Sequence, residues 1–374
     1  MNRRFIKVQS FAKKYWNLIS VAVISFYLGS WSTLSLMSID SSIESYSTKR
    51  AITVSAHEFN EEVEYAAFVL SAPTNWGKRD AIRSTWGRLV NNVVIHNEKK
   101  VFTWNQKYVP MNRTAFIKIY FVIGTKNLNP DILIKIAAEH RKNSDIVFLE
   151  SVEDKYENLA FKVLTGIKHF YERFENLKYV IKCDDDSFVR IDLLVVELEI
   201  HAPHMKALSL NKYVTFKNRN SYYDGFYWGY FNGKARVFSQ GKWKEKDWFL
   251  CDKYLPYALG GGYVISHSIV GFIASNYKYL SVYNSEDVSM GVWTAALKNI
   301  NRVHDIRFDT EWTTRGCQDH MLVRQKQTPS DMFQMYETLV SSDGKIMCLT
   351  EDIKRNTYFY NWNVSPSNCC TIIH

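Results

Sequence analysis

The residues best suited to chemistry are three consecutive aspartates, Asp184, Asp185 and Asp186, which follow an apolar run. Carboxylates two positions apart in a tight turn can both face one hard divalent cation. No cysteine and histidine spacing typical of zinc lies nearby, so Asp184 and Asp186 are predicted to bind Mg²⁺ or Mn²⁺, whose natural partner is a pyrophosphate. An ordinary acidic turn is the alternative, but three adjacent like charges without a counter-ion would repel one another.

An α/β sheet must position these aspartates, because apolar strands alternate with helices through the first half of the chain. Strands are predicted at residues 65–70, 116–123, 145–149 and 179–183, with helices from about 78, after Asn129-Pro130-Asp131, over 156–174 and over 191–200. Strands that are apolar on both faces are typical of a parallel sheet covered by helices on both sides. Such sheets bind ligands at the carboxyl ends of their strands, where the aspartate run lies.

The second half of the chain has a different texture. Aromatic residues crowd positions 222–231 and recur as far as 257, with weak periodicity. We expect this half to consist of loops, short strands and a helix near 286–298, packed on the first half within one domain. The globular region then has a first half at 65–200 and a second half at 201–374, with a polar insertion at 88–113.

The front of the chain predicts a membrane anchor. Five basic residues precede the first acid, Asp40, and residues 15–39 carry no charge. This pattern predicts a cytosolic tail at 1–14, a transmembrane signal anchor at 15–39, a stem at 40–64 and a lumenal remainder. A cleaved signal peptide is the alternative, but Gly29-Ser30 followed by Trp31 is a poor cleavage site. The span is only modestly hydrophobic, which suits a thin early-secretory membrane.

The formal net charge of +9 does not indicate a nucleic-acid-binding protein. The first 44 residues contain five basic and two acidic side chains, which leaves 42 basic against 36 acidic ones, or +6, on the rest. That excess is spread without a basic block, so no groove for a phosphate backbone is expected.

Six cysteines agree with a lumenal compartment. Cys183 lies in a predicted buried strand and is expected to stay free. The other five have no zinc-like spacing and are disulfide candidates, namely Cys251, Cys317, Cys348, Cys369 and Cys370. Five cysteines cannot all pair with one another, and which one is left over stays open. The sequon at Asn112 also predicts a lumenal domain, and the sequon at Asn363 is weaker because Pro366 follows it.

Several spaced motifs occur in an order that is typical of one family. They are Arg79-xxx-Arg83-Ser-Thr-Trp86, Glu153-Asp154-x-Tyr156-x-Asn158-Leu159-xx-Lys162, Asp184-Asp-Asp186, Tyr254-Leu-Pro-Tyr-Ala-Leu-Gly-Gly-Gly-Tyr263 and Glu286-Asp287-Val288. Together they resemble the β-1,3-galactosyltransferases of glycosyltransferase family 31. The resemblance covers roughly residues 65–370. It implies a GT-A-type nucleotide-diphospho-sugar transferase fold, UDP-galactose as donor, and a single-pass type II protein of the Golgi membrane.

Further motifs are similar to those of the family members that add the second galactose of the glycosaminoglycan–protein linkage. These motifs are Trp228-Gly229, His304-Asp-x-Arg-Phe-Asp-Thr-Glu311, Arg315-Gly-Cys317 and Cys369-Cys370. The implied acceptor is the galactose of a Gal-β-1,4-xylose linker on a proteoglycan core protein. One alternative is a family relative that acts on a glycolipid or mucin-type acceptor, or that uses UDP-N-acetylglucosamine. Another is a membrane-bound lectin or chaperone that keeps the fold without turnover.

The resemblance implies a role for each motif residue. Asp287 would be the general base, because an acceptor hydroxyl is a weak nucleophile, and one displacement would invert the anomeric carbon. The structural alternative for Asp287 is a first-turn acid that complements the helix dipole. Predicted donor contacts are Arg79, Arg83, Asp154, Asn158, Lys162, Asp185, Gly261 and Gly262. Predicted acceptor contacts are Glu286, Trp228 and Tyr257, with Tyr254 and Trp312 as weaker candidates, although single aromatics more often belong to the core.

One position departs from the family pattern. Relatives often supply a metal-binding histidine after a Leu-Val pair, but Leu322-Val323 is followed here by Arg324-Gln325. His320, His304 or water are the candidate replacements. His304 beside Asp305 can equally be a structural hydrogen-bonded pair.

Overall fold

The computed structural model describes residues 24–28, 62–97, 111–201, 214–216, 225–298 and 300–373. The chain divides into two compact units, Met1–Glu58 and Phe59–His374. Only a helical segment at 24–28 is described in the first unit, so the predicted tail and nearly all of the predicted span and stem lie outside the described residues. Among the residues that are described, no helix combines the length and the apolar composition needed to cross a membrane.

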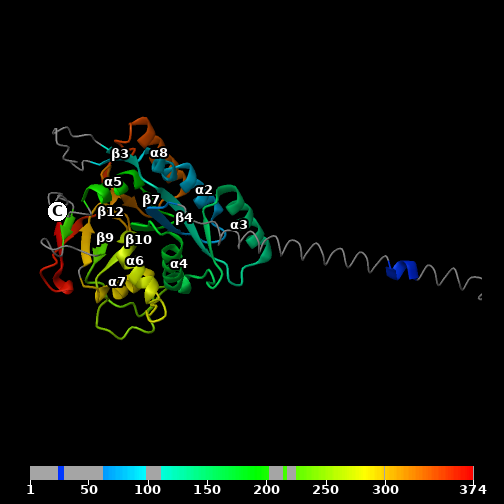
Figure 1. Cartoon of the computed structure of the whole chain (residues 1–374). Coiled ribbons are helices and arrows are strands. Elements are labelled where there is room, and N and C mark those ends of the chain that lie inside the picture. Colours follow the sequence, from blue (N-terminus) through cyan, green and yellow to red (C-terminus); the bar gives the residue numbers. More distant parts are fainter. Residues whose placement is uncertain are drawn as a thin grey trace, which may run out of the picture. The chain divides into compact units, whose positions relative to one another are not determined.

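A mixed eight-stranded sheet forms the centre of the second unit (Figure 1), in the order β5-β4-β1-β6-β10-β9-β11-β8. Four neighbouring parallel strands come from the first half, namely β1 Tyr65–Leu70, β4 Ile117–Gly124, β5 Ile146–Leu149 and β6 Tyr179–Asp184. The second half supplies the other four, namely β8 Val214–Phe216, β9 Gly225–Asn232, β10 Tyr257–Ser266 and β11 Ile300–Asp305. The predicted first-half strands are therefore confirmed to within one residue. The expectation of only short strands in the second half is wrong, because β9 and β10 are long and extend the main sheet.

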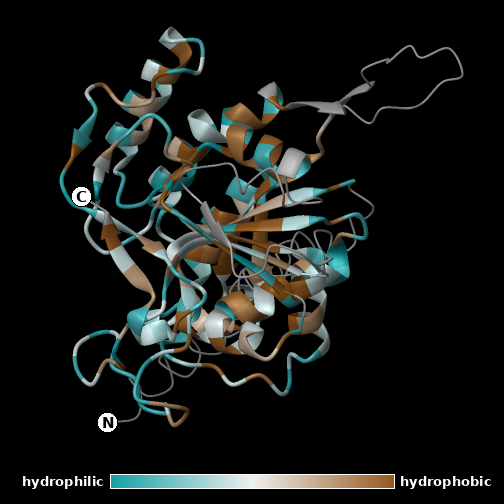
Figure 2. Ribbon diagram, turned by 90° about the vertical axis from the view of Figure 1, so that its left-hand side faces the viewer, coloured by the Kyte–Doolittle hydropathy of each residue, from teal (hydrophilic) through white to brown (hydrophobic). Residues whose placement is uncertain are grey.

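Helices cover both faces of this sheet, so the expected α/β layering is confirmed. On one face lie α2 Trp76–Ser84, α3 Pro130–Asn143, α5 Ile191–His201 and α8 Pro329–Ser341, and on the other lie α4 Leu159–Arg173, α6 His267–Ser275 and α7 Glu286–Ala295. Alternate residues of β1 enter the two hydrophobic clusters, as the strand period requires. Figure 2 shows hydrophobic residues concentrated in the central strands and in the helices that cover them.

Local sequence explains where two of these helices begin. The side chain of Asn129 accepts a hydrogen bond from the backbone N–H of Asp131 at 2.8 Å, and Pro130 occupies the first helical position of α3, as predicted. Thr328 and Asp331 form a reciprocal capping box at the start of α8. These caps satisfy backbone N–H groups that have no partner inside the helix.

Smaller sheets and two disulfides complete the second unit. The short strands are β2 Val94–Asn97, β3 Met111–Thr114, β7 Phe188–Val189, β12 Phe308–Asp309, β13 Gly316–Cys317, β14 Val323–Arg324, β15 Asp352–Ile353, β16 Thr357–Tyr360 and β17 Cys370–Ile373. Cys317 pairs with Cys348, and Cys369 pairs with Cys370. Cys183 is buried and free, as predicted, whereas Cys251 is exposed and free, so the prediction of Cys251 as a disulfide partner is wrong.

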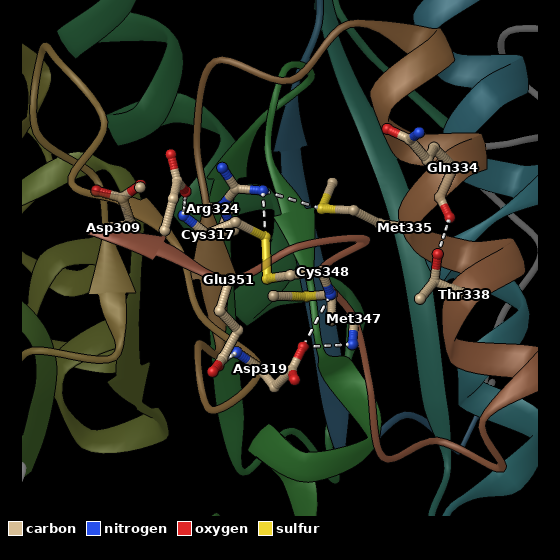
Figure 3. The surroundings of a disulfide bond; sticks show 12 residues. Asp309, Cys317, Asp319, Arg324, Gln334, Met335, Thr338, Met347, Cys348 and Glu351 are labelled. Atoms are coloured by element: carbon tan, nitrogen blue, oxygen red, sulfur yellow. Dashed lines mark hydrogen bonds between the residues drawn. A yellow bond between two sulfur atoms is a disulfide. The ribbon is translucent and has the colours of Figure 1, made fainter. Parts of the chain in front are cut away.

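Beside the first disulfide, the guanidinium of Arg324 donates to the sulfur atoms of Cys317 and Met335 (Figure 3). The two sequons occupy different settings. Asn112 lies in β3, and Asn363 lies in an exposed turn near the C-terminus.

Candidate active site

A cavity of about 400 Å³ opens where β1 and β6 end and where α7 begins. Its lining includes the predicted site residues Asp184, Tyr257, Gly261, Glu286 and Asp287. The structure therefore brings the metal candidate Asp184 to the same cavity as the base candidate Asp287, although they are about 100 residues apart in the chain. The second metal candidate, Asp186, is not among the lining residues. The cavity lies at the carboxyl ends of parallel strands, as the sheet architecture predicts.

Asp184 and Asp186 differ in how their oxygens are satisfied. Both oxygens of Asp184 accept hydrogen bonds, from Lys182 at 3.1 Å and from the Gln325 amide at 2.7 Å. One oxygen of Asp186 is 3.4 Å from the Lys326 ammonium, and the other is buried without a hydrogen-bond partner among the described residues. Burial, followed by the charge of Asp184, raises the pKa of Asp186. A buried carboxylate oxygen with no donor is the kind of atom that a cation would satisfy.

The open oxygen of Asp186 fits Mg²⁺ or Mn²⁺ at the predicted Asp184–Asp186 site, where the cation would replace the Lys182 or Gln325 contact of Asp184. In the described part of the chain, no three His, Cys, Asp or Glu side chains gather to hold a metal by themselves. Ions of this type commonly take one or two carboxylates and complete their shell with water and substrate phosphates. The remaining positions are therefore left to ligands of that kind.

The histidines considered as a third ligand are placed elsewhere. His304 is fully buried, its Nδ1 accepts from the backbone N–H of Phe231 at 3.0 Å, and its Nε2 lies 2.9 Å from the carbonyl of Tyr358. Both ring nitrogens are used, so His304 is structural and the suggestion that it binds the metal is wrong. His320 is not among the residues that line the cavity.

Lys182 is a buried link that the sequence did not indicate. Its ammonium donates to Asp184, to the backbone carbonyl of Gly260 and to Glu286, so it joins three elements. Burial lowers the pKa of Lys182, but the carboxylates of Asp184 and Glu286 more than offset this and leave the pKa raised. Glu286 also accepts from the Tyr263 hydroxyl at 3.0 Å, and burial raises the pKa of Glu286 to about 7 although Lys182 opposes the shift.

Asp287 is held in a defined orientation at the cavity wall. One carboxylate oxygen accepts from the backbone N–H of Gly260 at 3.0 Å, and the other accepts from Val288 at 2.8 Å. Burial raises the pKa of Asp287, which makes the carboxylate a better proton acceptor. A Cβ at Gly260 would lie 2.5 Å from a Glu286 oxygen, so only glycine permits this approach. Ser285 precedes the helix but makes no capping side-chain hydrogen bond.

The other glycines of the run meet protein atoms as well. A Cβ at Gly261 would lie 2.3 Å from the Gln325 side-chain oxygen, and a Cβ at Gly262 would lie 2.8 Å from Val323. Close packing therefore explains both glycines, and their predicted contact with the donor stays a prediction.

Asp185 belongs to a separate polar cluster whose members are not among the residues that line the cavity. Its buried carboxylate accepts from Ser71 at 2.9 Å, from Asn75 at 2.8 Å and from Lys78 at 2.9 Å. Ser71 follows β1, and its carbonyl accepts from the buried ammonium of Lys162 at 2.8 Å. The cluster thus ties the end of β1 to the aspartate turn after β6.

The remaining predicted donor contacts support this frame and do not line the cavity. Arg79 is fully buried, forms a bidentate ion pair with Glu139 on α3 at 2.9 and 2.7 Å, and donates to Ser71 at 3.1 Å. Arg83 binds Asp145 at 2.7 Å. The geometry gives these arginines a positioning role, whereas the prediction was a direct contact with the uracil or diphosphate.

The predicted donor contacts at 154–162 are similarly occupied. Asp154 accepts from Lys162 at 2.6 Å and from the N–H of Gly124 at 2.9 Å. Asn158 donates to the carbonyl of Glu153 at 3.0 Å. The lining of the cavity in this region comes instead from Tyr156 and Leu159.

The aromatic residues at the cavity differ from those predicted. Trp228 is 1% exposed and donates its indole N–H to Asp305 at 3.0 Å, so its predicted contact with the acceptor is wrong and it belongs to the core. Tyr257 lines the cavity, as does the weaker candidate Trp312, which is 64% exposed. Trp243 also lines the cavity. The sequence around it has no periodic pattern or motif that would have identified it as a site residue.

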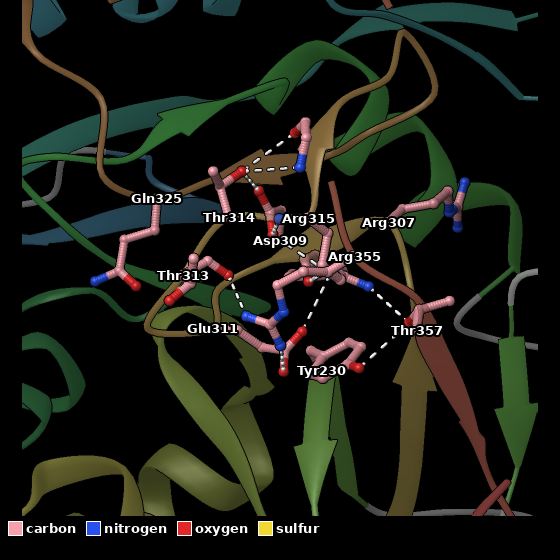
Figure 4. Close-up of polar contacts among 12 residues, drawn as sticks. Tyr230, Arg307, Asp309, Glu311, Thr313, Thr314, Arg315, Gln325, Arg355 and Thr357 are labelled. Atoms are coloured by element: carbon pink, nitrogen blue, oxygen red, sulfur yellow. Dashed lines mark hydrogen bonds and ion pairs between the residues drawn. The ribbon is translucent and has the colours of Figure 1, made fainter. Parts of the chain in front are cut away.

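A wall of charged contacts supports the side of the cavity that carries Glu311. Arg355 donates to Glu311 at 3.0 Å, and Arg315 donates to Asp309 and to Thr357 (Figure 4). Thr310 also lines the cavity, and its hydroxyl is buried without a hydrogen-bond partner among the described residues. This side of the cavity therefore carries an anchored carboxylate beside a hydroxyl that is buried within the wall.

The sequence is similar to proteins of known activity. A family model described as Galactosyltransferase matches residues 77–305. Beta-1,3-galactosyltransferase 6 of Mus musculus is 36% identical over 307 residues, which are 82% of this chain and 82% of that protein. Hydroxyproline O-galactosyltransferase GALT5 of Arabidopsis thaliana is 26% identical over 288 residues, which are 76% of this chain but 37% of that protein. A crystal structure of the galactosyltransferase LgtC covers 64% of this chain and 72% of its own, at 14% identity and a TM-score of 0.26, a likeness too weak to place any residue.

Proposed function

This chain belongs to the Galactosyltransferase family and is a galactosyltransferase, and from that premise we propose its specific reaction. It transfers galactose from UDP-galactose, in a β-1,3 bond, to the galactose of a Gal-β-1,4-xylose linker on a proteoglycan core protein. The similarity to mouse beta-1,3-galactosyltransferase 6 supports the linkage. The motifs Trp228-Gly229, Arg315-Gly-Cys317 and Cys369-Cys370 support the acceptor. Family membership favours this enzyme over a lectin or chaperone without turnover.

The observation that carries the proposal is one cavity that presents Asp184 at one strand end and Asp287 at a helix start. In the proposed step, the acceptor oxygen bonds to the anomeric carbon while the bond from that carbon to the β-phosphate oxygen breaks. The hydroxyl proton passes to Asp287, and UDP leaves with the bonding electrons. A single displacement of this kind converts an α-linked donor sugar into a β-linked product.

The remaining groups prepare this step. The backbone N–H groups of Gly260 and Val288 hold the Asp287 carboxylate in place before the acceptor arrives. Mn²⁺ or Mg²⁺, when bound by Asp184 and Asp186, supplies positive charge to the diphosphate. Glu286, fixed by Lys182 and Tyr263, is the neighbouring carboxylate that we assign to the acceptor.

We also propose a GT-A-type fold and a type II orientation in the Golgi membrane. The site at the carboxyl ends of parallel strands supports the fold type. The five basic residues before the uncharged stretch at 15–39 support the orientation.

The test uses the purified full-length chain in detergent with Mn²⁺, UDP-galactose and short acceptors. We expect transfer to a Gal-β-1,4-xyloside, a β-1,3 linkage in the product by NMR, and much slower transfer to glycolipid or mucin-type sugars. UDP-N-acetylglucosamine serves as the competing donor. Transfer to other acceptors but not to the xyloside would contradict the linker assignment and leave the family membership intact.

A further inference from the structure

We propose that Lys242 and Lys326 form a two-ammonium site that binds the diphosphate of the donor and of the UDP product in the absence of a metal. The proposal rests on the proposed donor, UDP-galactose. Among the described residues that line the cavity, Lys242 and Lys326 are the only lysines or arginines. The same lining presents the carboxylates of Asp184, Glu286, Asp287 and Glu311. A dianionic ligand entering this anionic cavity needs positive charge from the protein side.

Lys242 is held at the cavity mouth by aromatic rings. Its ammonium lies 4.5 Å from the ring centroid of Trp243, 4.8 Å from that of Trp312 and 5.3 Å from that of Tyr156. Such rings attract a cation through their quadrupoles without neutralising its charge. No carboxylate of a described residue pairs with Lys242, so its charge is available to an anion.

The backbone of Lys242 is fixed relative to the proposed base. The Asn284 amide donates to the carbonyl of Lys242 at 3.0 Å and to that of Lys244 at 3.2 Å. The backbone N–H of Asn284 donates to Glu245 at 3.0 Å. Asn284 lies three residues before Asp287, so the loop that carries Lys242 and the start of α7 form one hydrogen-bonded unit.

Lys326 adopts a conformation that a non-glycine residue rarely keeps without cause. Its φ of 65° is in the left-handed region, and the flanking N–H groups of Gln325 and Gln327 are fixed on the carbonyls of Asp309 and Asp186 at 3.0 and 2.8 Å. The ammonium of Lys326 lies 3.4 Å from Asp186 and 5.8 Å from the ring centroid of Trp312. The two backbone hydrogen bonds therefore fix the segment that carries a second cation near the indole that Lys242 also contacts.

Both ammonium groups thus lie near the Trp312 ring, Lys242 at 4.8 Å and Lys326 at 5.8 Å from its centroid, and Lys326 also contacts Asp186. In the metal-free protein the Lys326 side chain is 40% exposed and its contact with Asp186 is 3.4 Å long, so its ammonium is open to a second anionic partner. Both lysines therefore attract an anion without a metal. We therefore expect UDP to bind without metal. Uridine lacks the diphosphate, so its affinity should be the same for wild type and for the lysine variants.

The experiment is isothermal titration calorimetry of UDP and of uridine on the full-length chain in detergent, first with EDTA and then with Mn²⁺. Lys242→Ala and Lys326→Ala should each weaken UDP binding in EDTA about tenfold, as expected for a lost hydrogen bond to a charged group. Lys326→Gly keeps the left-handed backbone without strain and should show the same loss. Lys244→Ala, two residues from Lys242 and outside the cavity lining, is the matched control. Lys242→Arg should restore most of the affinity.

The outcomes separate this proposal from the proposed function. If wild type binds UDP only with Mn²⁺, or if both lysine variants bind UDP in EDTA as tightly as Lys244→Ala, the two-ammonium site is wrong and the enzyme assignment stands. If wild type binds no UDP under either condition, the proposed donor fails together with the site. A melting temperature close to that of wild type shows that each variant is folded.

Discussion

Asp287 is the residue on which the proposed chemistry depends most directly. Asp287→Asn keeps the volume of the side chain but cannot accept the hydroxyl proton. Because positioned general bases contribute roughly 10²–10⁴-fold, we expect kcat to fall by about 10³ while UDP affinity stays nearly unchanged. Steady-state kinetics with the xyloside acceptor measure the first effect, and calorimetry measures the second. Near-normal turnover in a folded variant would remove Asp287 from the mechanism.

Lys182 gives a second prediction at the residue scale. Lys182→Met leaves the buried carboxylate of Glu286 and the neighbouring Asp184 without their shared cation. Removing one partner of a buried ion pair costs about 3–5 kcal/mol of unfolding free energy. The double variant Lys182→Met with Glu286→Gln removes one of the stranded charges and should recover part of that loss. Urea denaturation of the single and double variants measures this recovery. Equal destabilisation by the two would contradict the ion pair between Lys182 and Glu286.

The sequence identified residues whose types and spacing suit few roles, but it did not reveal which residues those side chains contact. The aspartate run stood out because few other arrangements explain three adjacent like charges, and the acids at the start of α7 stood out through their family motif. Lys182 did not stand out, because a lysine inside an apolar strand has no local signal of its partners. Trp228 shows the converse, since its family motif is real but its indole N–H binds Asp305 in the core.

At the scale of elements, β11 and its buried histidine predict a pH dependence of stability. Burial lowers the pKa of His304 from 6.5 to about 4. Between these values the unfolded chain binds more protons than the folded one, so stability is complete above pH 6.5 and is lost as the pH falls toward 4. Each pH unit in this window costs about 1.4 kcal/mol, so about 2 kcal/mol is lost by pH 5.

The measurement compares urea denaturation of wild type and His304→Gln at pH 7 and pH 5. The pKa of His169 on α4 is also lowered by burial to about 4, and the pKa of Glu286 is raised to about 7, so both groups titrate in this window in either protein. His304→Gln should be less stable at pH 7, and its loss of unfolding free energy between pH 7 and pH 5 should be about 2 kcal/mol smaller than that of wild type. An unchanged difference between the two pH values would contradict the contribution of His304.

The disulfides supply another prediction for elements. Cys317–Cys348 closes a loop of 31 residues between β13 and the segment after α8, whereas Cys369–Cys370 joins adjacent residues. By the loop-entropy relation, removing the first with paired Cys→Ala changes should cost about 3–4 kcal/mol. The second disulfide closes no long loop, so its removal should cost far less unfolding free energy. Equal losses in chemical denaturation would show that the stabilisation does not arise from loop closure.

Elements of the first half were predictable because their strands are short apolar runs between helix signals. In the second half, β9 buries seven of its eight residues, many of them aromatic, and therefore shows no alternation to distinguish it from a crowded loop. β10 carries an irregularity between Ala258 and Tyr263 that further obscures its period. Arg79 and Arg83 share a helix face as expected, but their common partner Glu139 comes from α3, a tertiary contact that spacing does not reveal.

At the scale of the whole molecule, the unequal distribution of charge is the basis of the proposed membrane orientation. In the proposed reaction, Asp184, Asp287 and the two lysines act on a nucleotide-sugar donor, and the proposed compartment that supplies it is the Golgi lumen. In the proposed orientation, the five basic residues before the uncharged stretch are the determinant that would place residues 40–374 on the lumenal side. Asn112 reports this orientation, because a sequon receives a glycan only in the secretory lumen.

We therefore predict that replacing Arg3, Arg4, Lys7, Lys13 and Lys14 by Glu lowers the fraction of chains glycosylated at Asn112 during synthesis into microsomes. Basic residues beside a span favour the cytosolic side, and this variant has none before the span. Lys49 and Arg50 remain after the span and favour the opposite orientation. Replacing Lys49 and Arg50 by Glu is the matched control and should leave glycosylation unchanged or raise it. Asn112→Gln identifies the band that carries the glycan, and protease protection gives an independent readout of topology. Full glycosylation and protection of the five-residue variant would mean that these charges do not set the orientation, and the type II assignment would then lose its support.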